Sequence, residues 1–341
     1  MKNFWKKLDR PIFVLAPMAD VTDCAFRKII TKYGHPDVFW TEFVSADGLA
    51  HPVAREKLLI DLKYDEAEHP IVAQIFGGKP ENINIASKLC AELGFDGVDI
   101  NMGCPDKSVE KQCAGAALIK NPELAKEIIR AAKEGAPNLP ISVKTRIGYN
   151  TNEIEKWIRC LLEEDIAVLT LHLRTRKEMS DVPAHWEAME RILEIRDEMG
   201  KETLIFGNGD AVDMNDARKK CEKFGCDGVM LGRAIFGNPW LFSKKKVPDF
   251  SGFLQASPGT FPVQNQELSL TLEEKLKVMI EHTKLFEEML GAHKNFAIMK
   301  KHYKAYVNGF EGAKELRMKL MEAKNAKEVE NTTLDFLSKI K

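Results

Sequence analysis

One cysteine stands where the chain could carry out chemistry. Cys104 follows the apolar run Val98-Asp99-Ile100-Asn101 and lies between Gly103 and Pro105. The run predicts a buried strand, and the glycine and proline predict a sharp break after it. A thiol exposed in a loop at a strand end can take part in catalysis. The alternative is a packed, inert cysteine, which is the usual fate of a free thiol.

The other apolar runs carry polar, small or turn-forming residues within them or close to their ends. They are Ala16, Pro17, Met18, Gln74, Asn101, Lys144, Arg146, His172, Arg174, Gly207, Asn208, Gly209, Asp210, Gly232 and Arg233. Each could be a capped strand end or a solvated charge. Lys144 is the hardest to explain in that way, because lysine is almost never buried in a strand without a partner. So many polar strand ends favour a single shared site.

Two of these segments predict a phosphate site. Glycine-rich turns after the seventh and eighth strands of a parallel barrel present backbone N–H groups to an anion. The segments Asn208–Gly209 and Gly232–Arg233 fit that description. A ligand that reaches from this phosphate site to Lys144, Gln74 and Asn101 would have the shape of FMN.

The residue types also suit a flavin reaction. Lys144 would stabilise the negative charge of reduced flavin, and the amides of Gln74 and Asn101 would bind the ring. Hydride would be added to one end of a polarised C=C bond, and the Cys104 thiol would protonate the other end.

The elements that must position these residues alternate between strands and helices. The predicted strands are Ile12–Ala16, Val38–Phe43, Ile71–Phe76, Gly97–Asn101, Ile141–Thr145, Ala167–His172, Thr203–Phe206 and Gly228–Leu231. Most of the stretches between them are amphipathic and begin with helix-capping residues. Eight parallel strands within about 230 residues predict a closed (β/α)8 TIM barrel. An open doubly wound sheet is the alternative, but the first strand lacks the glycine-rich turn usual there.

Beyond the predicted barrel the composition changes. Residues 247–270 are rich in Pro, Gly, Ser and Gln and show no periodicity, which predicts a linker. Residues 271–341 are helical in pattern and predict a small helical domain. We therefore expect a catalytic barrel over residues 1–246, then the linker, then the helical domain.

One segment of the helical domain has the pattern of a nucleic-acid contact. Residues 271–341 hold 14 Lys/Arg and 11 Asp/Glu, whereas the whole chain of 341 residues has a net charge of −1. On a helical wheel one apolar stripe faces inward, formed by Phe296, Met299, Tyr303, Tyr306 and Phe310. The cations beside this stripe are Lys294, Lys300, Lys301 and Lys304. Such a row can follow a phosphate backbone, and a merely solvated lysine face is the alternative.

Cysteine usage and hydropathy indicate the compartment. The seven cysteines form no C-x-x-C pair, which fits free thiols in a reducing cytoplasm better than disulfides or a zinc site. No apolar run has the length of a membrane helix. We expect a cytoplasmic monomer that holds no metal and contacts no membrane.

Taken in order, the motifs resemble the tRNA-dihydrouridine synthase family. They are APMADVTDCAFRKI at Ala16–Ile29, TEFVSADGL at Thr41–Leu49, QIFGG at Gln74–Gly78, DINMGCP at Asp99–Pro105, VKTRIG at Val143–Gly148, HLRTR at His172–Arg176, GNGD at Gly207–Asp210 and GVMLGRAIFGNPWLF at Gly228–Phe242. The segment MKKHYKAY at Met299–Tyr306 is similar to the basic, aromatic segment of the family's RNA-contacting domain. It adds His302 to the expected RNA contacts.

The resemblance implies a reaction and roles for residues. Cys104 would donate a proton to C5 of uracil, FMN would deliver hydride to C6, and NADPH would reduce the flavin. Lys144 and His172 would contact FMN, while Asn101 and Arg174 would lie close to flavin or uracil. Arg146 joins Arg174 among the expected substrate contacts.

The chain departs from the family pattern at three positions. Leu173 stands where the family has glycine between histidine and arginine, and Ala305 stands where an aromatic residue is usual. Cys113, in the glycine-rich segment after Cys104, is a rival thiol.

Three other functions remain as alternatives. One is another FMN-dependent barrel oxidoreductase acting on a small-molecule enone or pyrimidine. A second is a class I aldolase that uses Lys144 as a Schiff base, which would be colourless where a flavoprotein is yellow. The third is a non-catalytic RNA-binding protein, which would leave Cys104 and Lys144 without roles.

Overall fold

The computed structural model describes residues 3–243 and 271–340. Its centre is a sheet of eight parallel strands, paired in the order β1-β8-β7-β6-β5-β4-β3-β2. The strands are β1 (Ile12–Leu15), β2 (Phe39–Ser45), β3 (Ile71–Phe76), β4 (Gly97–Met102), β5 (Ile141–Arg146), β6 (Val168–His172), β7 (Leu204–Asn208) and β8 (Gly228–Leu231).

The sheet closes between its first and last members. Val14 pairs with Val38, just before β2. The Asp37 amide donates to the Phe13 carbonyl at 2.9 Å, and the Phe13 amide donates to Asp37 Oδ2 at 2.8 Å. The predicted (β/α)8 barrel is therefore confirmed.

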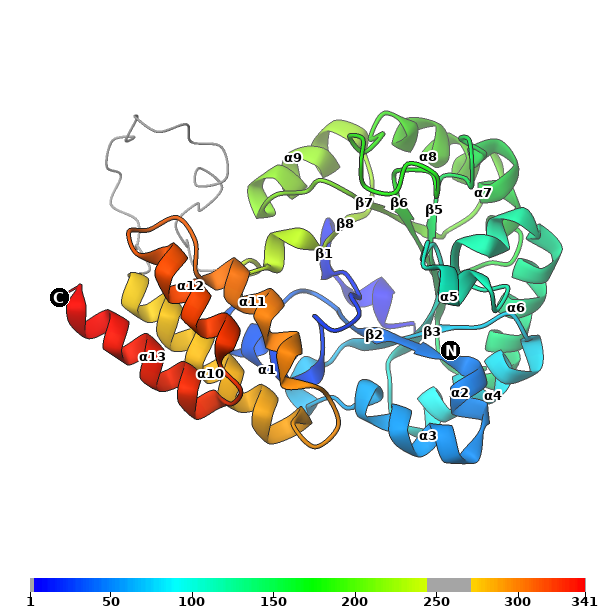
Figure 1. Ribbon diagram of the computed structural model, residues 1–341. Coiled ribbons are helices and arrows are strands. Elements are labelled where there is room, and N and C mark those ends of the chain that lie inside the picture. The colour runs from blue at the N-terminus through cyan, green and yellow to red at the C-terminus, as the bar shows by residue number, and fades with distance from the viewer. Residues whose placement is uncertain (1–2, 244–270, 341) are drawn as a thin grey trace. The chain divides into compact units, whose positions relative to one another are not determined.

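The strands are surrounded by helices, as Figure 1 shows for α4, α6, α7, α8 and α9. The helices are α1 (Cys24–Tyr33), α2 (Ala46–Ala50), α3 (Pro52–Leu58), α4 (Pro80–Glu92), α5 (Lys107–Glu110), α6 (Pro122–Gly135), α7 (Ile154–Leu162), α8 (Ala188–Glu198), α9 (Met214–Phe224), α10 (Leu272–Leu290), α11 (Met299–Tyr306), α12 (Ala313–Glu322) and α13 (Ala326–Lys339). Short 3-10 helices are η1 (Phe4–Lys7), η2 (Leu59–Leu62), η3 (Glu66–Glu68), η4 (Gly115–Lys120), η5 (Arg233–Ile235) and η7 (Phe296–Ile298).

Capping residues set the helix starts that the sequence predicts. Asp23 accepts a hydrogen bond from the Phe26 amide at 2.9 Å, and Asp213 accepts one from the Asp216 amide at 2.6 Å. These side chains satisfy amides that have no partner within their own helix. At the other end of α9, Gly225 adopts the left-handed backbone with φ +71, a conformation that glycine accepts without strain.

The barrel interior is packed with apolar side chains at the amino ends of the strands. Trp5, from η1, is buried there with Trp40 and Phe206, at ring-centroid distances of 5.8 and 5.7 Å. This packing closes one end of the barrel, so the polar site must lie at the carboxyl ends of the strands.

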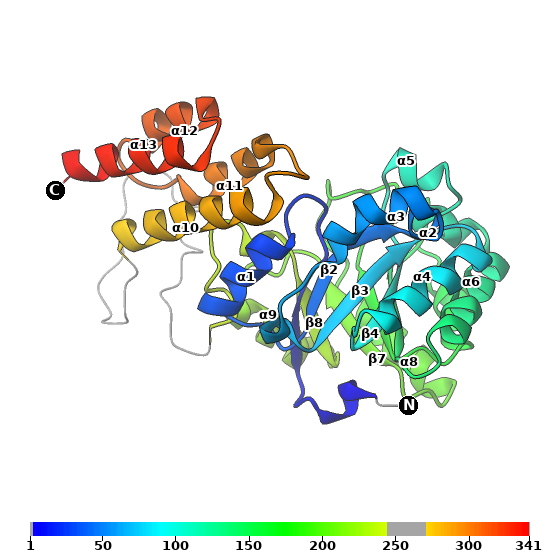
Figure 2. The ribbon, with the colours of Figure 1, turned by 90° about the horizontal axis from the view of Figure 1, so that it is seen from below.

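The described chain forms two compact units. Of the described residues, one unit comprises 3–19 and Asp37–Gly232, and the other comprises Asp20–Pro36, 233–243 and 271–340. This grouping differs from a division at residue 246, because α1 packs against α10 (Figure 2). Phe26 of α1 stacks on His282 with ring centroids 4.6 Å apart. The predicted linker, residues 247–270, lies outside the described residues, and the domain boundaries stay a prediction.

Candidate active site

Three neighbouring strands bring polar side chains into one ladder. Gln74 of β3 is in register with Asp99 of β4, Asp99 with Ser142 of β5, and Asn101 with Lys144. Alternate residues of a strand point to the same face, so Asp99 and Asn101 share one face of β4. The strand register therefore places these side chains side by side.

Asp99 is the anchor of this ladder. Its carboxylate accepts from Gln74 Nε2 and from Ser142 Oγ, both at 2.6 Å. Gln74 Oε1 then accepts from Asn101 Nδ2 at 3.0 Å. Burial raises the pKa of Asp99 to about 6, while its two hydrogen-bond donors and the charge of Lys144 oppose the rise. The ladder fixes the amide orientations of Gln74 and Asn101.

Lys144 is the cation of the site. Its side chain is half-buried and forms no hydrogen bond or ion pair with any residue in 3–243 or 271–340. Burial lowers the pKa of Lys144 to about 8, and the charge of Arg146 lowers it further, against the opposing negative charge of Asp99. An ammonium without a hydrogen-bond partner is available to an electron-rich ligand.

The loop after β4 is held in place around Cys104. Asn101 Oδ1 accepts from the amides of Gly103 at 3.1 Å and Cys104 at 2.9 Å. The Cys104 side chain packs against a small apolar cluster that contains Phe76, Val109 and Ala114. Burial raises the pKa of the Cys104 thiol, so the thiol stays protonated near neutral pH.

Gly115 allows the loop to fold back onto Cys104. Its φ is +60, and a Cβ there would lie 2.7 Å from the Cys104 carbonyl oxygen. The Ala116 amide donates to that same carbonyl at 2.9 Å. Cys113, the rival thiol, is exposed, whereas Cys104 is half-buried. Only Cys104 belongs to the apolar cluster beside the ladder.

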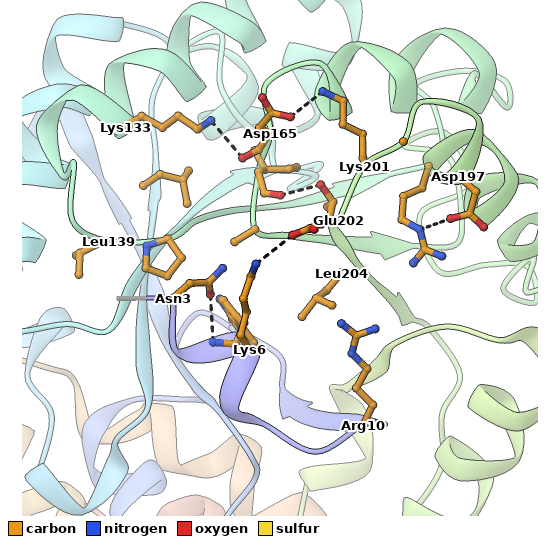
Figure 3. A pocket seen from close by; sticks show the side chains of 18 residues that line it. Asn3, Lys6, Arg10, Lys133, Leu139, Asp165, Asp197, Lys201, Glu202 and Leu204 are labelled. Atoms are coloured by element: carbon orange, nitrogen blue, oxygen red, sulfur yellow. Dashed lines mark hydrogen bonds and ion pairs between the residues drawn. The ribbon is translucent and has the colours of Figure 1, made fainter. Parts of the chain in front are cut away.

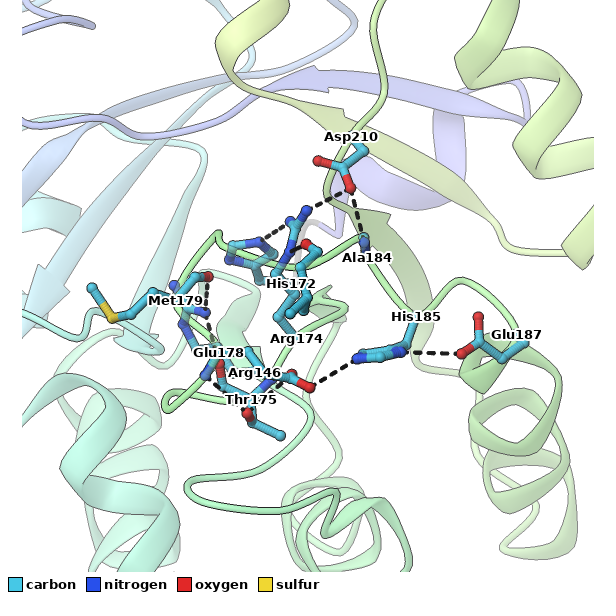
Figure 4. Close-up of polar contacts among 11 residues, drawn as sticks. Arg146, His172, Arg174, Thr175, Glu178, Met179, Ala184, His185, Glu187 and Asp210 are labelled. Carbon is cyan, nitrogen blue, oxygen red and sulfur yellow. Dashed lines mark hydrogen bonds and ion pairs between the residues drawn. The ribbon is translucent and has the colours of Figure 1, made fainter.

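Arg174 joins the loops after β6 and β7, as Figure 4 shows. Its guanidinium donates to His172 Nε2 at 2.9 Å, to Asp210 Oδ2 at 2.5 Å and to the Val182 carbonyl at 2.6 Å. Because Nε2 of His172 accepts from a cation, the imidazole carries its proton on Nδ1. Asp210 also accepts from the Ala184 amide at 2.8 Å.

Arg146 makes a similar set of contacts below this loop (Figure 4). Its side chain is buried and donates to the carbonyls of Gly103 at 2.9 Å, Thr175 at 3.0 Å and Met179 at 2.8 Å. Both arginines thus bind protein atoms in this structure. Their predicted contacts to substrate stay predictions.

The residues predicted to bind phosphate gather at the ends of β7, β8 and β1. Asn208 Nδ2 donates to the Met230 carbonyl at 2.7 Å. A Cβ on Gly232 would lie 3.6 Å from Ala16 Cβ and 3.8 Å from Met18 Sδ. Gly209 has φ +126, which glycine alone adopts readily.

Other members of the predicted phosphate site have different surroundings. Pro17 lies between Ala16 and Met18 and is buried, while the Asp210 carboxylate is engaged by Arg174. Arg233 opens η5 in the second unit, and its phosphate contact stays a prediction.

Several site residues were not singled out from the sequence. Asp99 could have been found from its spacing, since it lies two residues before Asn101 on a buried strand. The bond from Arg174 to Asp210, the anchor Ser142 and the ion pair between Glu110 and Arg176 depend on segments far apart in sequence.

The predicted RNA surface of the second unit needs one correction. His302 is fully buried between Phe26 and His282, so it presents no surface to a ligand. Lys301 and Lys304 are exposed, and Lys294 and Lys300 are half-buried. Met299, Tyr303 and Tyr306 are fully buried, as expected of the inward stripe. His302 was expected to contact RNA from its place in the MKKHYKAY segment, which does not show that it packs on the buried side of α11.

A separate depression lies at the opposite end of the barrel strands. It has a volume of about 930 Å³ and is lined by η1 and by the starts of β5, β6 and β7 (Figure 3). Its lysines are engaged, Lys201 by Asp165 at 2.7 Å and Lys6 by Glu202 at 3.0 Å. It is distinct from the ladder site at the carboxyl ends of the strands.

Neither a membrane span nor a metal cluster occurs among the described residues. Within residues 3–243 and 271–340, no helix has the length and hydropathy needed to cross a membrane. Over the same ranges, no group of three or more His, Cys, Asp or Glu side chains could hold a metal ion.

Fold and site together define a (β/α)8-barrel protein with a half-buried thiol and a lysine at the carboxyl ends of its strands. Among solved structures, a 2-naphthoyl-CoA reductase in complex with 2-naphthoyl-CoA superposes with a TM-score of 0.50. It is 11% identical and covers 68% of this chain and 49% of its own. That likeness concerns the fold alone.

Sequence comparison identifies the family. The protein-family model described as "Dihydrouridine synthase (Dus)" matches residues 14–341. The chain is 43% identical over 336 residues to the probable tRNA-dihydrouridine synthase 2 of Bacillus subtilis, covering 98% of this chain and 97% of the relative. A probable tRNA-dihydrouridine synthase of Staphylococcus aureus is 42% identical over 329 residues, covering 96% and 93%. The chain belongs to the dihydrouridine synthase family and is an oxidoreductase.

Proposed function

We propose that this protein reduces the C5=C6 bond of uridines in tRNA, with FMN as its flavin, NADPH as reductant and Cys104 as proton donor. The observation that carries the proposal is the placement of a protonated thiol, in the loop after β4, at the same barrel end as the lysine ammonium of the adjacent strand β5. The names of the relatives support tRNA as the substrate. They do not favour the small-molecule alternative.

The residues of the ladder fit a flavin. Lys144 offers an ammonium that no described side chain engages, and an electron-rich ring edge would satisfy it. The Gln74 amide is held by Asp99, and the Asn101 amide is held in turn by Gln74 Oε1. The turns at Asn208–Gly209 and Gly232–Arg233 would hold the phosphate, and His172 would contact the ring.

Each residue of the chain then has a defined task. When bound, FMN would supply the hydride that is added to C6 of uracil. The Cys104 thiol gives its proton to C5, and its raised pKa keeps that proton available at neutral pH. Lys144 balances negative charge, while Arg146 and Arg174 hold the surrounding loops and lie near the base.

The substrate must reach this site from a folded RNA. A base stacked in tRNA cannot enter a barrel mouth, so the nucleotide leaves the stack and inserts into the site. The exposed Lys301 and Lys304, with Lys294 and Lys300, bind the phosphate backbone. The protein would work as a monomer in the cytoplasm, where its tRNA substrate is.

A direct test is to map dihydrouridine in tRNA from cells that lack the protein. We expect loss of dihydrouridine at one or more positions. We also expect restoration by the wild-type gene, but not by a gene encoding Cys104→Ala. An unchanged map would contradict the proposed function.

A further inference from the structure

We propose that the ion pair between Glu110 and Arg176 positions the Cys104 thiol for proton transfer. The proposal rests on the function proposed above. Arg176 Nε donates to Glu110 Oε1 at 2.9 Å, and its terminal nitrogen donates to Glu110 Oε2 at 2.5 Å. The pair is largely buried, with side-chain exposures of 24% for Arg176 and 13% for Glu110. Two parallel hydrogen bonds fix direction as well as distance.

Glu110 is coupled to Cys104 through one helical turn. Asp106 begins α5 by accepting from the Ser108 amide at 2.7 Å, and the Glu110 amide donates to the Asp106 carbonyl at 2.9 Å. On this turn Val109 packs in the same apolar cluster as the Cys104 side chain. The neighbouring residue Glu110 reaches Arg176 instead. A shift of Glu110 would therefore move the wall against which the thiol packs.

Arg176 is itself anchored on two sides. Its amide donates to the Gly148 carbonyl at 2.9 Å, in the loop after β5. Its guanidinium also donates to the Pro105 carbonyl at 3.3 Å, directly beside Cys104. The Tyr149 ring lies over the guanidinium at 5.6 Å. Arg176 thus ties the loops after β5 and β6 to the loop that carries the thiol.

The loop needs such a restraint because its two ends are glycines. Gly103 precedes the thiol, and Gly115, with φ +60, closes the loop behind it. A proton donor must lie within hydrogen-bond reach of the reacting carbon, and a displacement of about 1 Å can cost about 10²-fold in rate. Glu110 and Arg176 are positioning residues, since neither needs to touch the substrate.

The test measures the two half-reactions of Glu110→Gln and Arg176→Lys. Glu110→Gln keeps the size of the side chain but removes its charge. Arg176→Lys keeps the charge but removes the planar guanidinium that makes two parallel hydrogen bonds. We expect kcat on tRNA to fall about 10- to 100-fold. The KM for tRNA and the rate of flavin reduction by NADPH should stay within about twofold, because the thiol is not used there.

A second ion pair of the barrel provides a matched control. Arg130 binds Glu164 through Nε at 2.9 Å and a terminal nitrogen at 2.5 Å, and Glu164 is also nearly buried. Glu164→Gln removes the same kind of interaction away from Cys104 and should leave kcat unchanged. The exchanged pair Glu110→Arg/Arg176→Glu should recover part of the lost rate. A loss in Glu164→Gln equal to that in Glu110→Gln would overturn the proposal.

A further measurement separates positioning from the proposed function. The alkylation rate of Cys104 by iodoacetamide, followed by peptide mass spectrometry, requires neither tRNA nor turnover. We expect Glu110→Gln and Arg176→Lys to change this rate several-fold, while Glu164→Gln does not. Unchanged alkylation and unchanged kcat in both site variants would refute the positioning role. An inactive wild-type protein with altered alkylation in the variants would refute only the proposed function.

Discussion

Cys104 lies in the loop after β4 and Lys144 on the neighbouring strand β5, and burial changes their pKa values in opposite directions. The pKa of the thiol rises, and the pKa of the ammonium falls to about 8. Burial disfavours the charged form of each group, which keeps the thiol protonated and the lysine near the edge of its charged range. At neutral pH the site therefore contains a neutral acid and a cation, as reduction of a polarised double bond requires.

Replacing Cys104 by alanine should separate the two halves of the reaction. The thiol acts only when uracil is protonated, so flavin reduction by NADPH should continue at the wild-type rate. Oxidation by tRNA should slow by about 10²–10⁴-fold, the typical contribution of a positioned acid. Stopped-flow spectroscopy of both half-reactions measures this. Cys113→Ala is the control, and a loss in that variant with normal Cys104→Ala activity would assign the acid to Cys113.

Lys144 should make flavin binding depend on pH. Its pKa in the folded protein lies below that of a free lysine, so the ammonium loses its proton as pH rises through about 8. The affinity of the apoprotein for FMN should therefore be constant below pH 8 and should fall above it. Lys144→Met should bind FMN more weakly, with no such decrease. Fluorescence titration of FMN provides the measurement, and wild-type affinity that is flat across this interval would exclude Lys144 as the cation.

At the scale of the element, strand register assembles the site. Gln74, Asp99 and Ser142 come from three consecutive strands and meet because parallel strands in register place equivalent positions side by side. The loops then add residues from further along the chain. The His172–Arg174–Asp210 group joins the ends of β6 and β7, which differ by more than 30 residues in sequence.

Strands with local patterns could be predicted from the sequence. The bounds of Ile71–Phe76 and Gly228–Leu231 were predicted correctly, because apolar runs flanked by turn residues depend on neighbouring residues alone. The grouping of the polar strand ends into one site was predicted because the active site of a parallel barrel forms at the carboxyl ends of its strands. The engagement of Arg174 by Asp210 and the packing of α1 on α10 could not be predicted, since both depend on tertiary contacts between distant segments.

A buried histidine pair should make the second unit sensitive to acid. His282 and His302 are fully buried, with ring centroids 4.5 Å apart. Burial lowers the pKa of His302 to about 3, and that of His282 falls well below 6.5. The unfolded chain therefore binds more protons below pH 6.5, so stability is complete above that pH and is lost as pH falls. For His302 alone the cost at pH 5 is on the order of 2 kcal/mol.

Urea unfolding at pH 7.5 and pH 5 tests this expectation. The unfolding midpoint of the wild type should be lower at pH 5, and His302→Phe should reduce the difference. The exposed His293 offers a control, because His293→Gln should leave the pH dependence unchanged. Equal pH dependence in the wild type and His302→Phe would show that this pair does not cause the acid sensitivity.

At the scale of the whole molecule, the two compact units carry different parts of the proposed function. The first contains the ladder, the thiol and most of the predicted flavin site. The second contains Lys294, just before η7, and Lys300, Lys301 and Lys304 of α11. These residues belong to the segment 291–310, which has four lysines and no acidic residue. This division predicts that RNA affinity and flavin chemistry can be changed independently.

The triple variant Lys300→Ala/Lys301→Ala/Lys304→Ala tests that independence. Removing each lysine that binds a phosphate should reduce the slope of log K against log salt by roughly 0.7–0.9. We expect weaker tRNA binding at low salt, a smaller slope and an unchanged flavin spectrum. Parental affinity and slope would exclude this surface as the RNA-binding surface.

The most direct test of the proposed function is turnover of a defined substrate by the purified protein. An unmodified tRNA transcript, incubated with the protein, FMN and NADPH, should gain the mass of two hydrogen atoms at specific uridines. Free uridine at the same concentration should react very poorly, because the site requires a base presented by folded RNA. Comparable kcat/KM on free uridine and tRNA, or no mass gain in tRNA, would contradict the central claim.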